Sequence, residues 1–145
     1  MSKSATIQSI DHINLDVPAE HLNTVSQFYS DAVGLTEGFR PDFDFDGRWL
    51  YASGIERAVL HLASYGANDT APLHQSTGRF NHVCFAMQGL AAHREKLQNA
   101  GTEFKESNRP NAEVVQLFLT DPTGVMVELN FSKAAEGLPL PETVS

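Results

Sequence analysis

The chain has 145 residues, of which 41% are hydrophobic and 19% are charged, a composition typical of one compact globular domain. Its formal net charge is −8, and no run of basic residues is available to neutralise phosphates, so nucleic acid is excluded as the expected partner. The single cysteine, Cys84, cannot form an internal disulfide. Because the chain also lacks a signal-like or membrane-spanning apolar run, we expect a cytoplasmic protein with no membrane partner.

The first half of the chain is predicted to form four strands and one helix. Residues 7–17 alternate apolar and polar side chains, as a strand buried on one face does. A helix is predicted for residues 20–33, with Gly34 where a C-cap belongs. Three further strands, bounded by glycine and aspartate, are predicted at residues 36–40, 48–52 and 58–63.

The second half is predicted to repeat this order. Its expected elements are a strand at 80–87, a helix at 90–100 and strands at 103–107, 114–120 and 124–131. We therefore expect an α+β fold in a single domain, 1–145. It would comprise two βαβββ modules at about 7–64 and 79–131, a linker at about 65–78 and a loose C-terminal tail at 132–145.

Four metal-capable side chains occupy matching places in the two halves. His12 and His82 each open an alternating run, 70 residues apart, and His61 and Glu128 each lie in the last strand of their half, 67 residues apart. Strand alternation places all four opposite the face that packs on the helices. A lone histidine on a strand is more often an ordinary core or surface residue, but independent histidines have no reason to recur at equivalent points of a repeat. The pattern predicts one metal site shared by the two halves, and imidazole with carboxylate suits Fe, Ni, Co, Zn or Mn.

Other candidate residues carry weaker signals. His21 and His93 are predicted to face solvent on the helices, and Cys84 is predicted to be an inert thiol on the same face as His82. Four aromatic residues form either a wall for a small organic ligand or part of the core: Phe43, Phe45, Trp49 and Tyr51. The sequence contains no glycine-rich phosphate loop, nucleophile elbow or Cys-x-x-Cys pair.

Residues 7–131 resemble the vicinal oxygen chelate superfamily, which includes glyoxalase I, extradiol dioxygenases and fosfomycin- and bleomycin-resistance proteins. Three stretches carry the resemblance: 10–15 (IDHINL), 28–35 and 116–129 (QLFLTDPTGVMVEL). The resemblance implies paired βαβββ modules that form a curled, half-open barrel around a divalent metal, with ligands at His12, His61, His82 and Glu128. It also implies a homodimer; whether one chain holds the site or two chains share it stays open.

The resemblance implies an enzyme, a glyoxalase-like lyase or isomerase that acts on a small molecule with adjacent oxygens. Glu128 or His61 would move the proton. Glyoxalase I generally has a glutamate at the place of His61, so this histidine is either a ligand or an acid/base group beside the metal. One alternative is an extradiol-type dioxygenase that uses His12, His82 and Glu128. Another is a metal-free, drug-binding protein with an acidic, aromatic cleft.

Overall fold

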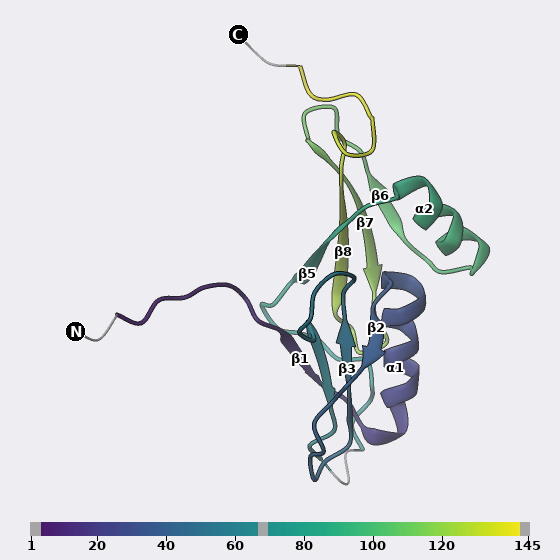
Figure 1. Ribbon diagram of the computed structural model, residues 1–145. Coiled ribbons are helices and arrows are strands. Elements are labelled where there is room, and N and C mark those ends of the chain that lie inside the picture. The colour runs from purple at the N-terminus through teal and green to yellow at the C-terminus, as the bar shows by residue number, and fades with distance from the viewer. Residues whose placement is uncertain (1–3, 67–69, 143–145) are drawn as a thin grey trace.

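The structure, a computed structural model, describes residues 4–66 and 70–142, which form two sheets of four strands with two main helices (Figure 1). The elements of the first half are β1 (Ile13–Asp16), η1 (Ala19–His21), α1 (Leu22–Phe28), η2 (Tyr29–Val33), β2 (Thr36–Gly38), β3 (Gly47–Tyr51) and β4 (Leu60–Ala63). Those of the second half are β5 (His82–Met87), α2 (Leu90–Asn99), β6 (Lys105–Ser107), β7 (Val114–Thr120) and β8 (Met126–Ser132).

The two sheets share one topology. The strand orders are β1-β4-β3-β2 and β5-β8-β7-β6, and in each sheet the first strand runs parallel to the last while the other neighbours are antiparallel. The register places Asn14 opposite His61 in the first sheet and Cys84 opposite Glu128 in the second. The predicted pair of βαβββ units is therefore confirmed, and the two sheets stay open rather than closing into a barrel.

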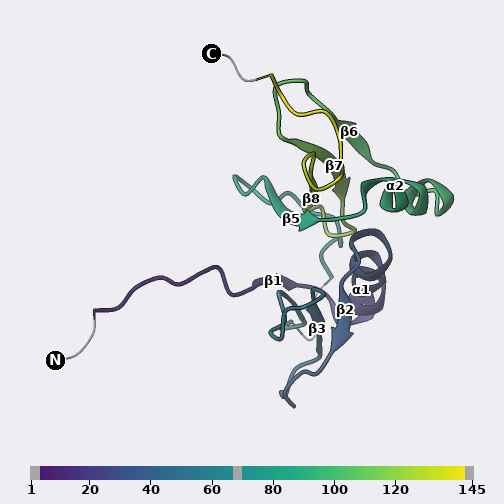
Figure 2. The same ribbon diagram turned by 45° about the horizontal axis from the view of Figure 1, so that its top comes forward.

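One core joins both halves. Both helices lie on the same side of the sheets, next to each other, and the N-terminal segment extends away on the opposite side (Figures 1 and 2). The alternation along the strands sends leucine and valine side chains toward the helices: Leu60 and Leu62 of β4 are fully buried, as are Val127 and Leu129 of β8. The intervening residues, among them His61 and Glu128, lie on the other face of each sheet.

Helix packing ties the halves together at His93, whose Nε2 lies 2.8 Å from the backbone carbonyl of Ala32. The expectation that His93 faces solvent is therefore wrong. The long helix was predicted as one element, but it consists of a 3-10 turn, an α-helix and a π-helical turn. It ends as predicted at Gly34, whose φ of 102° is the left-handed conformation that glycine adopts without strain.

Two terminal predictions are also wrong. The first strand begins only at Ile13, because residues 4–12 pair with no strand, and Ile7 and Ile10 are 96% and 83% exposed. The beginning of the tail, residues 133–136, is not loose: Lys133 is buried and donates to the Arg109 carbonyl at 2.7 Å, and Glu136 accepts a hydrogen bond from the Gly89 N–H at 2.7 Å.

Among residues 4–66 and 70–142, no helix has both the length and the apolar character that a membrane crossing requires.

Candidate metal-binding site

In the first sheet, the candidate ligands His12 and His61 lie against each other. Their rings stack at a centroid distance of 3.8 Å with an interplanar angle of 14°. β4 lies between β1 and β3, so His61 is flanked on its other side by Trp49, with a centroid distance of 4.0 Å and an angle of 9°. His61 is thus the middle ring of a three-ring stack.

The environment of His61 favours its neutral form. Burial lowers the pKa of His61, and the neighbouring His12 lowers it further. The neutral imidazole is the form that binds a metal or accepts a proton. His61 is therefore prepared for either of the roles that its sequence position predicts.

In the second sheet, the candidate ligand Glu128 lies next to the other candidate ligand, His82. Glu128 is only 7% exposed, and its Oε2 lies 3.6 Å from Nε2 of His82. Gln116 of the adjacent strand donates to Oε1 at 2.7 Å. Cys84 lies opposite Glu128 in the register, and its Sγ lies 3.9 Å from the Phe85 carbonyl oxygen. Burial, and then the neighbouring Glu128, raise the pKa of Cys84 to about 12, which keeps the thiol protonated and unreactive at neutral pH.

His12 and His82 are oriented in the same way by the residues that precede them. Nδ1 of His12 lies 2.7 Å from Oδ1 of Asp11, and Nδ1 of His82 lies 2.7 Å from Oδ1 of Asn81. A side-chain oxygen at Nδ1 selects the tautomer that carries its proton there, which leaves the Nε2 lone pair free. The hydrogen bond to His12 also lowers the pKa of Asp11.

Sequence reasoning did not assign this role to Asp11 and Asn81. The signal was nevertheless present, since an acid or amide precedes histidine at both points of the 70-residue repeat. Gln116 was missed because its partner Glu128 lies on the neighbouring strand.

A further polar residue, Asn130, extends this face of β8. Its Oδ1 is buried, and among the described residues no donor bonds to it. Asn130 follows Glu128 by two residues, so strand alternation places both side chains on one face. A buried acceptor without a donor costs free energy.

The four predicted ligands are brought together in pairs: His12 with His61, and His82 with Glu128. In the part of the chain that the structure describes, no group of three or more His, Cys, Asp or Glu side chains is placed to hold a metal ion. Each sheet therefore presents half of the predicted donor set.

The two paired modules fall within one family model. Residues 9–129 match the Glyoxalase/Bleomycin resistance protein/Dioxygenase superfamily. The chain belongs to this superfamily. No curated protein gives a significant match.

Solved structures of the superfamily share the fold at low sequence identity. A glyoxylase/bleomycin resistance protein/dioxygenase domain from Frankia sp. EAN1pec is 17% identical, with a TM-score of 0.67 over 88% of this chain and 93% of that one. A variant of the fosfomycin resistance protein FosX from Listeria monocytogenes, complexed with Mn(II) and 1S,2S-dihydroxypropylphosphonic acid, is 19% identical, with a TM-score of 0.64 over 88% and 94%. TnmS3, an antibiotic binding protein from Streptomyces sp. CB03234, is 19% identical, with a TM-score of 0.60 over 89% and 99%.

Proposed function

We propose that this protein is a metal-dependent lyase or isomerase of the superfamily that acts on a small molecule with adjacent oxygen atoms. The observation that carries the proposal is the matched orientation of His12 and His82, in which Nδ1 of each ring contacts a side-chain oxygen and Nε2 is left to bind a metal. A protein that only packed these rings would have no need of an oxygen acceptor at both Nδ1 atoms.

The donor set fits a divalent cation such as Fe, Ni, Co, Zn or Mn. Three imidazoles and one carboxylate are ligands that these ions accept, and Asp11, Asn81 and Gln116 supply the outer hydrogen bonds that such ligands usually have. The Mn(II) complex of FosX supports the assignment by similarity of fold. A divalent cation held here would act as a Lewis acid on the oxygens of the substrate.

We further propose that two chains share the site in a homodimer. Among the described residues of one chain, no three of these donors come together. In a two-fold symmetric dimer, the first sheet of each protomer could lie against the second sheet of its partner. His12 and His61 of one protomer would then complete the set begun by His82 and Glu128 of the other. Such a dimer would hold two equivalent sites.

The chain's own residues would handle the proton. Glu128 is a buried carboxylate with one oxygen fixed by Gln116, which leaves Oε2 to accept or return a proton. His61 is the second candidate, since it is held neutral between Trp49 and His12.

Metal content of the purified protein tests the proposal. We expect His12→Ala, His82→Ala and Glu128→Ala each to lose most bound metal by mass spectrometry, whereas the control His21→Ala keeps it. Unchanged metal content in all three would refute the metal site. For His61→Gln, metal loss identifies a ligand, and retained metal with lost turnover identifies an acid/base group.

Subunit mixing tests the shared site. A His12→Ala/His61→Ala chain and a His82→Ala/Glu128→Ala chain each lack one half-set. Unfolded together and refolded as a mixture, they should recover about a quarter of the wild-type sites, because only mixed dimers hold an intact set, and each holds one. No recovery in a mixture that has formed dimers would refute the sharing.

The dioxygenase alternative makes a different prediction for the same preparation. An isomerase should convert a panel of small hydroxy- and keto-carbonyl compounds without consuming oxygen. Oxygen uptake that depends on a catechol, with iron bound, would replace the isomerase assignment with ring cleavage.

A binding protein is the second candidate function, favoured by the aromatic side chains beside His61. TnmS3 has this fold and binds an antibiotic, which supports the same possibility. If the protein proved to contain no metal and to have no turnover, but bound aromatic molecules, the binding function would be preferred.

A further inference from the structure

A small cavity opens beside His61. Its volume is about 140 Å³, and it is lined by Asn14, Arg40, Phe43, Phe45, Trp49, His61, Leu62, Ala63 and Tyr65. This volume is close to that of a cavity that accommodates a benzene ring. Of the aromatic residues considered from the sequence, Tyr51 is not part of the lining, because its hydroxyl bonds to the Phe39 carbonyl.

Five of the nine lining residues have aromatic rings. Phe43 and Phe45 stack nearly parallel, with centroids 5.2 Å apart and an angle of 10°. Phe43 also contacts Trp49, and Phe45 contacts Tyr65, whose hydroxyl lies 3.5 Å from Oδ1 of Asn14. The aromatic contacts thus continue from His61 around the cavity to the strand beside it.

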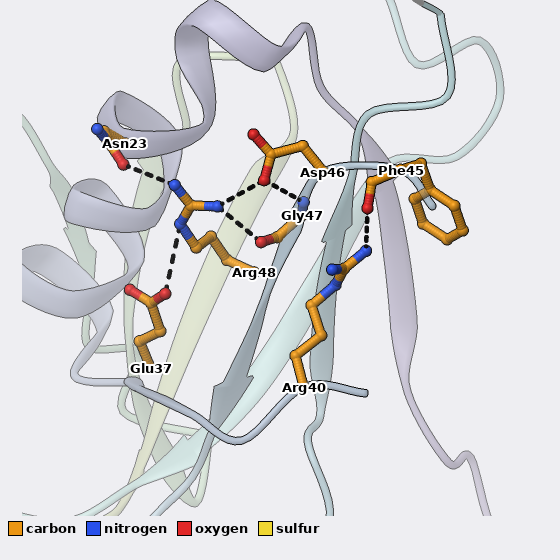
Figure 3. Close-up of polar contacts among 7 residues, drawn as sticks. All are labelled: Asn23, Glu37, Arg40, Phe45, Asp46, Gly47 and Arg48. Carbon is orange, nitrogen blue, oxygen red and sulfur yellow. Dashed lines mark hydrogen bonds and ion pairs between the residues drawn. The ribbon is translucent and has the colours of Figure 1, made fainter. Parts of the chain in front are cut away.

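Arg40 is the one fixed charge in this lining. Its guanidinium carbon lies 5.0 Å from the Phe43 ring centroid and 5.1 Å from that of Phe45, and its Nη2 donates to the Phe45 carbonyl at 2.8 Å (Figure 3). No described carboxylate forms an ion pair with it. A guanidinium has five N–H donors, so several remain for a ligand.

The backbone makes room for this arginine. A Cβ at residue 47 would lie 2.9 Å from Nε and 3.0 Å from Nη2 of Arg40, and 2.4 Å from the Leu62 carbonyl oxygen. Gly47 has ordinary backbone angles, so close approach rather than conformational freedom explains the glycine. The Arg40 side chain therefore packs closely against the start of β3 at Gly47.

Arg48 shows what a structural arginine looks like in the same region. It pairs with Glu37 at 3.3 Å and Asp46 at 3.0 Å, and it donates to Asn23 and to the Gly47 carbonyl (Figure 3). Its donors are engaged within the protein. Arg48 is paired with carboxylates inside the protein and Arg40 is not, which indicates that the Arg40 guanidinium binds an anion from outside the chain.

We propose that this cavity binds the planar carboxylate end of an aromatic acid, with the ring between the aromatic walls and the carboxylate on Arg40. A guanidinium fork matches a planar carboxylate in geometry, and the flat walls match a ring. This inference rests on the proposed function, because a ligand bound against His61 would extend toward the proposed metal site. The proposal narrows the substrate class of the enzyme to aromatic acids.

Trp49 is the only tryptophan in the chain, so its fluorescence reports directly on this cavity. We would titrate the full-length, EDTA-treated protein with benzoate, benzamide, cyclohexanecarboxylate and phenylphosphonate, exciting at the red edge of tryptophan absorption. Benzoate should change the emission saturably. Benzamide, which lacks the charge, and cyclohexanecarboxylate, which lacks the flat ring, should each bind at least about tenfold more weakly.

Arg40→Gln should weaken benzoate binding about tenfold or more, to the level of benzamide. Arg48→Gln makes the same change of net charge on a residue outside the cavity and should stay close to wild type. Circular dichroism and thermal melting check each fold. If Arg40→Gln does not fold, Arg40→Lys keeps the charge and loses the fork, and it should still weaken benzoate binding.

Equal binding of benzoate and benzamide, wild-type affinity in a folded Arg40 variant, or equal losses in the Arg40 and Arg48 variants would overturn the proposal. Tighter binding of phenylphosphonate than of benzoate would overturn the carboxylate assignment. The metal proposal fails separately: benzoate binding with no metal content in any preparation refutes the metal site alone, and metal binding without any benzoate response refutes the aromatic-acid site alone.

Discussion

The hydroxyl of Tyr29 donates a hydrogen bond of 2.5 Å to Oδ2 of Asp121, inside the protein and across 92 positions of sequence. Tyr29 belongs to the helical segment of the first half, and Asp121 begins the turn between β7 and β8 of the second. The other oxygen of Asp121 accepts hydrogen bonds from the Thr123 N–H and hydroxyl and from the Val125 N–H. One buried carboxylate therefore shapes a turn and joins the halves. Burial, and then the carboxylate, raise the pKa of Tyr29, so the phenol stays protonated and donates.

Replacing Tyr29 by Phe should lower the free energy of unfolding by about 1.5–3 kcal/mol, the usual range for a hydrogen bond to a charged group. Urea denaturation would measure the loss. Tyr51→Phe is the matched control, because that hydroxyl also donates at 2.5 Å, but at the surface and to the Phe39 carbonyl. It should cost less than about 0.5 kcal/mol. Equal losses in the two variants would contradict a special role for the link at Asp121.

Asn130 should show the opposite effect on stability. Its buried Oδ1 accepts no hydrogen bond from any described residue, so Asn130→Leu removes an unsatisfied acceptor and keeps a branched side chain with the same number of heavy atoms. The free energy of unfolding should rise by about 1 kcal/mol. A stability loss in urea denaturation would show that the amide already has a partner, such as a bound water.

The contact of His93 with the Ala32 carbonyl should make stability depend on pH. Burial lowers the pKa of His93, an effect only partly offset by the hydrogen bond to Ala32. The folded chain therefore binds fewer protons than the unfolded chain, in which the pKa is about 6.5. This contribution to stability is complete above pH 6.5 and declines as pH falls toward the lowered folded value.

His93→Gln keeps a donor for Ala32 and removes the titration. Thermal melting of wild type and variant from pH 8 to pH 5 should show a difference that shrinks as pH falls below about 6.5. His21→Gln removes a surface histidine and serves as the control. If the melting temperatures of the wild type and His93→Gln stayed parallel over this range, the assignment would be wrong.

The sequence predicted the repeat well, because strand alternation is a local property. His61 between Leu60 and Leu62 already implies one polar face and one core face, and the structure has both. Residues 7–12 also alternate, and for them the strand prediction was wrong. A strand forms only where a neighbouring strand supplies hydrogen bonds.

The missing parts of the site depend on contacts between elements. Gln116 bonds to Glu128 across two strands, and the guanidinium of Arg40 lies close to Gly47 of another strand. Neither contact follows from a periodic pattern in the sequence, so sequence analysis could not predict it. Asp11 and Asn81 are the exception, since they directly precede the two histidines and recur with them.

The repeated Nδ1 contacts predict how the metal site should respond to mutation. Asp11→Ala and Asn81→Ala remove the acceptors that fix His12 and His82, so each imidazole can rotate or change tautomer. Metal affinity, measured by competition with a chelator, should fall about 10–100-fold for each variant. Asp44→Ala and Asn111→Ala, which change exposed residues of the same types, are the matched controls and should retain wild-type affinity. Because the two acceptors act on separate ligands, we expect the double variant to lose more metal affinity than either single variant. If the single variants bound metal like the wild type, the histidines would need no orienting partner.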